Sequence, residues 1–248
     1  MARKDGRRPA DLRPVEMTRG YTQNAPGSVL IRAGRTVVLC TACWDDHVPP
    51  WKAGQGTGWV TAEYDMLPGA TTERRRRNRT NVDGRTQEIQ RLIGRSLRSV
   101  VDLAALGENS ILVDCDVLQA DGGTRTASIT GAYVAVCDAV TCAVRGGQIA
   151  ASPMLDNVAA VSVGRVDGDL LLDLDYPEDL AAEVDMNVVM TGSGRFIEVQ
   201  GTGEGATFTH TELDCMIRLA SRGIKELTRI QARALGERLP SPETEPTP

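Results

Sequence analysis

The chain has few histidine, lysine and aromatic residues. Its 248 residues include two His, three Lys and 4% aromatic side chains. Two histidines, His47 and His210, offer little for a zinc site, because no second Cys or His pair follows the CxxC of Cys40 and Cys43 at zinc-ligand spacing. We therefore interpret the six cysteines as small apolar residues of a protein from a reducing compartment, without disulfides or zinc.

Long apolar runs are also absent. No uninterrupted run approaches the ~20 residues that a membrane-spanning helix needs. The segment from Met1 to Arg13 is basic and polar, without the apolar region of a secretory signal. We therefore expect a cytoplasmic protein with no membrane partner. The formal net charge of −5 argues against a simple polyanion binder, and 41% hydrophobic residues are ordinary for a globular chain that buries a large core.

Charge is distributed unevenly along the chain. Residues 71–98 contain nine Arg and three acidic residues, a local charge of +6 (9 − 3), whereas residues 173–185 contain six acidic residues and no basic one. This separation predicts one surface for phosphate groups and another for a cation. Of the 28 basic residues, 25 are Arg, whose planar fork binds phosphate in a bidentate way. Genome base composition would produce the same bias.

The hydrophobic periodicity predicts an α+β chain. Strands are expected in a hairpin at residues 27–40, at 58–64, at 113–119, and in hairpins at 158–174 and 187–200. Helices are expected at residues 86–106, from 127 to just before 146, and at 211–235, and an arginine-rich loop at 67–84. No linker-like stretch divides residues 10–238. We therefore expect one catalytic domain over residues 1–238 and a disordered tail at 239–248.

The most informative segment is the turn from Gly122 to Ser128. An alternating strand runs into Gly122-Gly123, then into Thr124-Arg125-Thr126, and a helix follows. Free N–H groups at a helix N-terminus and a nearby guanidinium attract an anion, usually phosphate. A plain turn whose Thr or Ser caps the helix fits the local sequence equally well. Arg85 is a second candidate for phosphate binding.

Two further clusters each allow two interpretations. The acidic residues 173–187 suit Mg²⁺ or Mn²⁺, which prefer hard oxygen ligands, but a loop of solvated acids has the same composition. The run from Arg74 to Arg79 is either a solvated charge run or a contact with nucleic acid. Arg91, Arg95 and Arg98 are spaced to share one helix face, which is favourable if that face meets an anion.

Several long motifs resemble the ribonuclease PH family. Residues 85–98, 113–131 and 173–190 carry the resemblance, and residues 56–64 and 198–202 fit as well. It covers about residues 3–235. Polynucleotide phosphorylase shares the fold but has two such cores and appended RNA-binding domains, for which this chain has no room. The resemblance implies an α+β ribonuclease PH-type domain, similar to ribosomal protein S5 domain 2, with a βαβα core and mixed sheets packed against helices.

The resemblance also implies an activity. Members are phosphate-dependent 3′→5′ exoribonucleases that trim the 3′ extensions of tRNA precursors and release nucleoside diphosphates, in a reversible reaction. It implies Mg²⁺ or Mn²⁺ as cofactor, inorganic phosphate as co-substrate, and a homohexamer built as a trimer of dimers. The implied residues are Asp179 and Asp185 for metal and proton transfer; Arg85, Gly123, Thr124, Arg125 and Ser128 for phosphate; and Arg74, Arg75, Arg76, Arg77, Arg79, Arg91 and Arg95 for RNA.

Departures from the family pattern are small. Gly203 replaces a common alanine, a change we expect to be neutral, and the arginine run is denser than usual. One alternative is a non-catalytic RNA-binding ring subunit of an exosome-like assembly, but a scaffold needs none of Arg85, Arg125, Asp179 and Asp185. A nucleotide-binding enzyme unrelated to RNA is a further alternative, and it would not need the arginines of residues 71–98.

Overall fold

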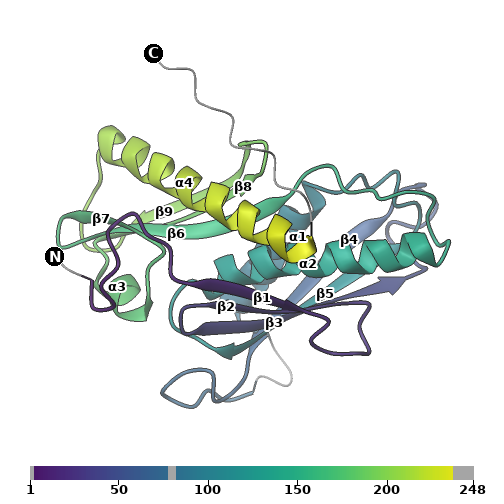
Figure 1. The fold of residues 1–248 in the computed structure, drawn as a ribbon, viewed down its shortest axis with the longest axis horizontal. Helices are drawn as coiled ribbons and strands as arrows, with labels where there is room; N and C mark the ends of the chain where they lie inside the picture. The colour runs from purple at the N-terminus through teal and green to yellow at the C-terminus, as the bar shows by residue number, and fades with distance from the viewer. Residues whose placement is uncertain (1–2, 78–81, 237–248) are drawn as a thin grey trace.

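The computed structural model describes residues 3–77 and 82–236, and the tail predicted at 239–248 lies outside these ranges. The described chain contains two sheets and four helices (Figure 1). The elements are β1 (Val15–Arg19), β2 (Gly27–Ala33), β3 (Thr36–Asp45), β4 (Trp59–Met66), α1 (Gly84–Arg98), β5 (Ser110–Gln119), α2 (Thr124–Arg145), β6 (Val158–Val166), β7 (Asp169–Leu172), α3 (Tyr176–Ala181), β8 (Val184–Thr191), β9 (Phe196–Gly203) and α4 (His210–Leu235).

The first sheet is mixed. Its strand order is β1-β2-β3-β5-β4, and β4 runs parallel to β5 while the other pairs are antiparallel. Strand β5 alternates between the two faces, with Val113 and Cys115 buried and Asp114 and Asp116 exposed. The buried face packs against α1 and α2, whose apolar side chains form the larger core cluster with it. Strand β5 ends at Gln119, and Ala120 and Asp121 connect it to Gly122 and Gly123.

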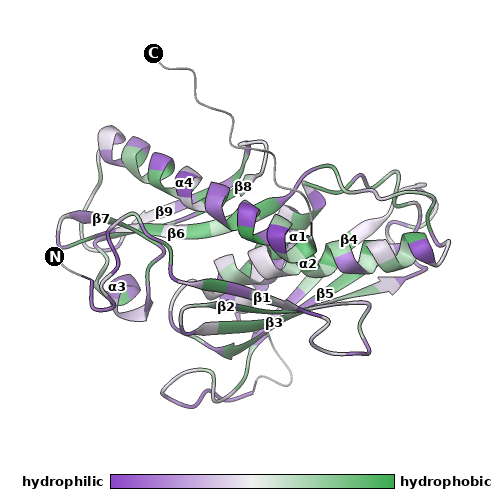
Figure 2. Cartoon of the chain, in the orientation of Figure 1, coloured by the Kyte–Doolittle hydropathy of each residue, from purple (hydrophilic) through white to green (hydrophobic). Residues whose placement is uncertain are grey.

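The second sheet is antiparallel, with the order β7-β6-β8-β9. Helix α4 lies along it, and α2 lies between the two sheets (Figure 1). Hydropathy follows these positions, since α2 is mainly hydrophobic and α4 carries polar residues along its length (Figure 2). The buried Gln231 of α4 donates to the backbone oxygens of Thr130 and Val158, which ties α4 to both α2 and β6.

Helix α2 is long and apolar enough to cross a membrane by length and composition alone. Polar residues interrupt each apolar run of α2, so a search for uninterrupted apolar runs does not find this helix. Within its most apolar 18-residue window, 72% of the residues are buried inside the protein. A central core helix has the same composition, and the burial assigns α2 to that role.

The structure corrects two predicted helix boundaries. Helix α1 ends at Arg98 instead of residue 106, because Ser99 caps it and Val101 then bridges to Met154. Helix α2 begins at Thr124 instead of residue 127. The predicted hairpins are confirmed as β2–β3, β6–β7 and β8–β9, while β1 and the short α3 were not predicted. All six cysteines are free thiols, and Cys40 and Cys115 are buried.

Candidate functional site

The glycine turn adopts a conformation that other residues rarely adopt. Gly122 and Gly123 have φ values of 75° and 63°, both in the left-handed region. A Cβ on Gly122 would lie 2.5 Å from the carbonyl oxygen of Leu174 and 2.9 Å from the nitrogen of Tyr176. The turn therefore lies backbone against backbone on the segment that leads into α3, and only glycine fits there.

The N-terminus of α2 is left open by this turn. Its first backbone hydrogen bond runs from the Ala127 N–H to the Gly123 oxygen at 3.0 Å, so the N–H groups before Ala127 have no intrahelical acceptor. Gly123 occupies the N-cap position and makes no side-chain cap hydrogen bond, and the Thr126 hydroxyl donates back to the Gly123 oxygen at 2.9 Å. The turn is therefore no ordinary Ser or Thr cap, and its free donors suit an anion.

All three hydroxyl residues of this helix start, Thr124, Thr126 and Ser128, are buried. Thr124 shares a 2.8 Å hydrogen bond with the hydroxyl of Tyr64. Ser128 is fully buried, and its hydroxyl donates to the Thr124 oxygen at 2.8 Å. In this structure Ser128 therefore supports the helix start from inside and does not reach the surface, whereas the sequence resemblance implies a place near the phosphate.

The two arginines predicted to bind phosphate come from different helices. Arg125 lies in the first turn of α2 and donates to Gln200 Oε1 at 3.0 Å, with Glu88 Oε1 at 3.6 Å. Arg85 is exposed in the first turn of α1, which Asp83 caps through the Thr86 N–H. Burial raises the pKa of the Asp179 carboxyl, and the nearby charges of Arg85 and Arg125 offset this only in part. The structure thus brings Arg85, Arg125 and Asp179 to one place.

Asp179 and Asp185 form the acidic half of the site. Asp179 lies on α3 and Asp185 on β8. Burial, and next the charge of Asp179, raise the pKa of Asp185 to about 6. Its Oδ1 is buried without a hydrogen-bond partner in the described structure, and its Oδ2 accepts a long 3.4 Å bond from Asn187. The backbone N–H of Met186 also acts on this carboxyl and lowers its pKa slightly. A lone buried carboxylate oxygen beside a like charge fits a hard divalent cation.

Two of the remaining acids of the cluster, Asp173 and Glu178, are neutralised by arginines of the N-terminal segment. Arg13 binds the carboxylate of Asp173, and Arg3 binds Glu178 through two bonds of 2.7 and 2.6 Å. Burial raises the pKa of Asp173, but Arg13 outweighs it and holds the pKa below its usual value. Sequence spacing could not reveal these pairs, because the partners are 160 and 175 residues apart. The acidic run thus divides into structural acids and the Asp179–Asp185 pair.

The predicted RNA-binding arginines before α1 are largely exposed. Arg74, Arg76 and Arg77 are exposed, Arg75 lies 3.6 Å from Asp83, and Arg79 lies outside the described residues.

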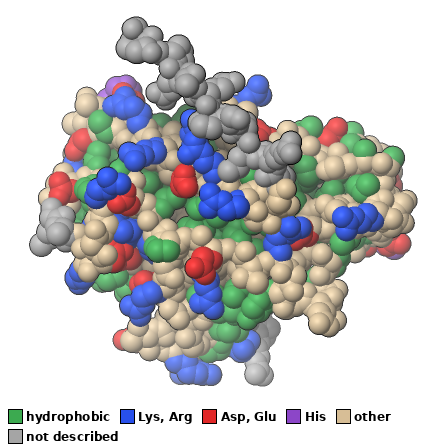
Figure 3. Space-filling model, viewed as in Figure 1, with side chains coloured by type: hydrophobic (Ala, Val, Ile, Leu, Met, Phe, Trp, Pro, Cys, Tyr) green, Lys and Arg blue, Asp and Glu red, His purple; other side chains and the backbone are tan. Residues whose placement is uncertain are grey.

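The arginines of α1 do not form one ridge. Arg91 is exposed, and Arg95 lies 3.2 Å from Glu198 of β9. Arg98 lies over the ring of Trp59 and donates to the Val60 oxygen. Its guanidinium is therefore held against the protein and does not face solvent as those of Arg91 and Arg95 do. On the face seen in Figure 3, basic and acidic side chains are intermixed, without a large patch of one sign.

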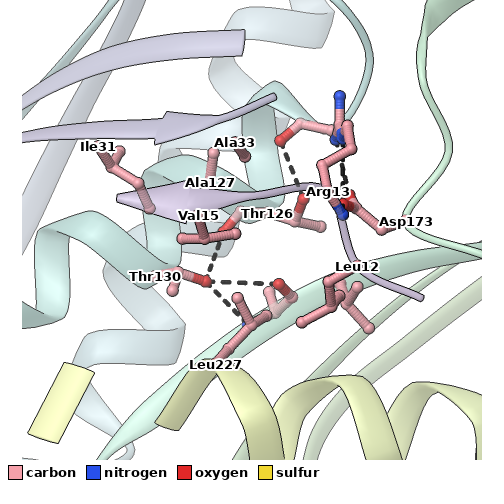
Figure 4. A pocket seen from close by; sticks show the side chains of 13 residues that line it. Leu12, Arg13, Val15, Ile31, Ala33, Thr126, Ala127, Thr130, Asp173 and Leu227 are labelled. Atoms are coloured by element: carbon pink, nitrogen blue, oxygen red, sulfur yellow. Dashed lines mark hydrogen bonds and ion pairs between the residues drawn. The ribbon is translucent and has the colours of Figure 1, made fainter. Parts of the chain in front are cut away.

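Two cavities adjoin the site. A small one of about 20 Å³ lies between β1, α2, β6 and α4, with the Arg13 and Asp173 side chains facing each other at one end (Figure 4). It has room for one water molecule. The larger one, of about 360 Å³, extends from Tyr64 along β4 and β5. Its acidic lining was not predicted and consists of Glu63, Asp65, Asp114 and Asp116.

Two protein-family models together match most of the chain. The model of the 3′ exoribonuclease family, domain 1, matches residues 11–141, and domain 2 of the same family matches residues 156–223. Ribonuclease PH of Rhodopirellula baltica is 59% identical over 244 residues, which cover 93% of this chain and 97% of that protein.

Solved structures share the fold at low identity. Rice (Oryza sativa) Rrp46 superposes with a TM-score of 0.76 at 18% identity, over 94% of this chain and all of that one. An Archaeoglobus fulgidus exosome with RNA bound to the active site superposes with a TM-score of 0.77 at 20% identity, over 92% of this chain and 91% of that one. These two likenesses establish the fold alone.

Proposed function

The chain belongs to the ribonuclease PH family of 3′ exoribonucleases, and from this membership and the site we propose a mechanism with its residues. The protein is a phosphate-dependent 3′→5′ exoribonuclease and nucleotidyltransferase that processes tRNA precursors. The 59% identity to a ribonuclease PH over nearly the whole chain favours this activity over a non-catalytic subunit of an exosome-like assembly.

The attacking group is inorganic phosphate. One of its oxygens forms a bond to the phosphorus of the last phosphodiester, and the bond from that phosphorus to the 3′ oxygen of the preceding nucleotide breaks. The 3′ oxygen takes up a proton, and the last nucleotide leaves as a nucleoside diphosphate. Because a phosphodiester is exchanged for a diphosphate linkage, the reaction runs backwards when nucleoside diphosphate is abundant.

Arg85, Arg125 and the open N-terminus of α2 hold the phosphate. The free N–H groups around Gly123 and Thr124 bind its oxygens, and the guanidiniums balance its charge. The single observation that carries this assignment is that the Gly122 turn packs backbone against backbone on the segment that leads into α3, the helix of Asp179. The anion site and the acid pair are therefore neighbours.

Asp179 and Asp185 would hold Mg²⁺ or Mn²⁺, which when bound stabilises charge that develops on the reacting phosphate oxygens. Asp185 has a pKa near neutrality, about 6, so its carboxyl is suited to exchange a proton with the leaving 3′ oxygen. The exposed arginines Arg74, Arg76 and Arg77 contact the RNA backbone, and Arg91 and Arg95 extend this surface along α1.

We also propose a cytoplasmic homohexamer, a trimer of dimers. Large apolar side chains that are exposed in one chain support subunit contacts, among them Trp51 at 62% and Leu155 at 67% exposure. The six free cysteines agree with a reducing compartment. Native mass spectrometry tests the hexamer, and a monomer at micromolar concentration would exclude it.

The activity is tested with a 3′-extended RNA labelled in its last nucleotides. We expect release of labelled nucleoside diphosphates in the presence of phosphate and Mg²⁺, and almost none without phosphate. Nucleoside monophosphates as products, or equal release without phosphate, would exclude phosphorolysis.

A further inference from the structure

We propose that Arg13 is a positioning residue that fixes the anion-binding turn against the segment carrying Asp179. Through the single carboxylate of Asp173, it joins two parts of the site that are about fifty residues apart in the chain. The inference rests on the proposed function, since it assumes that phosphate binds at the turn. Arg13 itself touches neither phosphate nor RNA in this assignment.

Arg13 and Asp173 form a buried pair with an unusually complete set of contacts. The backbone N–H of Arg13 donates to Asp173 Oδ2 at 2.8 Å, its Nε donates to the same oxygen at 3.0 Å, and its Nη2 donates to Oδ1 at 2.6 Å. The two residues are 4% and 5% exposed. A buried ion pair contributes little net stability compared with apolar packing, so such a pair is better explained by the geometry it enforces.

The same guanidinium holds the anion-binding turn. Arg13 Nη1 donates to the Asp121 oxygen at 2.5 Å, and the Gly122 oxygen lies 3.4 Å from Nη1. Gly123 lies directly against the fork, since a Cβ there would be 2.9 Å from Nη2. One planar group therefore contacts all three residues that precede Thr124. The turn cannot move without breaking contacts to Arg13.

Asp173 fixes the acidic side of the site. It has a left-handed φ of 55°, and its N–H donates to the Ser162 oxygen at 2.7 Å. The backbone oxygen of Asp173 accepts hydrogen bonds of 2.9 Å from the side chains of both Arg3 and Arg7. Two residues later Asp175 caps α3, the helix that carries Asp179. Because the arginines fix Asp173, they also fix the position at which α3 begins.

A lysine cannot replace this arrangement. The guanidinium presents donors in several fixed directions, and here they point to a carboxylate on one side and to two carbonyl oxygens on the other. An ammonium group keeps the charge but not the planar fork. Arg13→Lys therefore separates the positioning role from the charge.

Thr36 provides a contrast, because it holds the turn alone. Its hydroxyl donates to the Gly122 oxygen at 2.7 Å and accepts from the Asp121 N–H at 3.0 Å, and it has no described bond to the acidic segment. A change at Thr36 should disturb the phosphate side only, whereas a change at Arg13 should disturb both sides.

The experiment compares Arg13→Lys with Thr36→Val and with Arg8→Lys, in the full-length protein. Arg8 lies in the same N-terminal segment, is 81% exposed in its side chain and pairs with Asp11, so it is a matched control. Binding of inorganic phosphate and of Mn²⁺ is measured by calorimetry without RNA, and kcat and KM for phosphate are measured separately.

We expect Arg13→Lys to weaken the binding of both phosphate and Mn²⁺ and to lower kcat/KM by about ten- to a hundredfold, as a displaced site does. Thr36→Val should weaken phosphate binding only, and Arg8→Lys should change neither. If Arg13→Lys folds, whatever its Tm, and binds phosphate and Mn²⁺ with wild-type affinity and wild-type kcat/KM, the proposal is wrong.

If Arg13→Lys does not fold, Asp173→Asn, which keeps the shape of the side chain, takes its place with the same expected losses. Wild-type affinities in Asp173→Asn would then overturn the proposal. A wild-type protein that neither binds phosphate nor needs it would refute the proposed function instead, so the two failures are distinguishable.

Discussion

Asp185 should make the binding of a divalent metal strongly dependent on pH. A carboxyl group binds a metal only when it is deprotonated. The pKa of Asp185 is raised from 3.8 to about 6, first by burial and next by the charge of Asp179. Because the shift is upward, the ionised form is present above pH 6 and is lost as the pH falls through that value.

The expected size of the effect follows from this pKa. With a pKa of about 6, roughly 90% of Asp185 is ionised at pH 7 and roughly 10% at pH 5, so the Kd for Mn²⁺ should rise about tenfold over this range. With an ordinary aspartate pKa, more than about 90% would remain ionised at pH 5, and the Kd would hardly change.

Mn²⁺ binding without RNA, followed by electron paramagnetic resonance between pH 5 and 7, measures the effect. Glu204→Gln is an informative variant, because the charge of Glu204 also raises the pKa of Asp185. In this variant the loss of Mn²⁺ should occur at a lower pH. A Kd that is constant from pH 5 to 7 in the wild type would refute the reasoning.

Three further variants test other parts of the site. Gly122→Ala should lower the free energy of unfolding by about 1–3 kcal/mol, because φ is 75° and a Cβ there meets backbone atoms; unchanged urea denaturation would contradict this. Arg125→Ala should raise the KM for phosphate by about ten- to a hundredfold through the loss of charge-assisted hydrogen bonds, and a wild-type KM would remove Arg125 from the anion site. Replacing Arg74, Arg76 and Arg77 together by Ala should weaken RNA binding and reduce the slope of log K against log salt by about 2, whereas an unchanged slope would exclude backbone contacts.

The local sequence indicated only part of the candidate site. The pattern of two glycines followed by Thr124-Arg125 predicted a turn before a helix, but it fitted an anion site and a plain helix cap equally well. Arg85, Asp179 and Asp185 depended on the family resemblance, since no spacing rule joins positions from α1, α3 and β8. Their assignment to phosphate and metal stays a prediction.

Tertiary contacts explain what the sequence could not reveal. The acidic run showed no basic residue nearby in sequence, yet Arg3 and Arg13 neutralise two of its members from the other end of the chain. Helix α1 ends early because Val100 and Val101, which fit a helical stripe, pack in the core from a turn. Strand β1 has little apolar pattern of its own, and pairing with β2 defines it.

The central claim is that the bound phosphate is the attacking reagent. Incubation of the protein with unlabelled tRNA precursor and ³²P-labelled inorganic phosphate tests it most directly. We expect nucleoside diphosphates that carry the label in the β-phosphate, and loss of this label transfer in Arg125→Ala. Unlabelled nucleoside monophosphates, with all of the label left in inorganic phosphate, would contradict it.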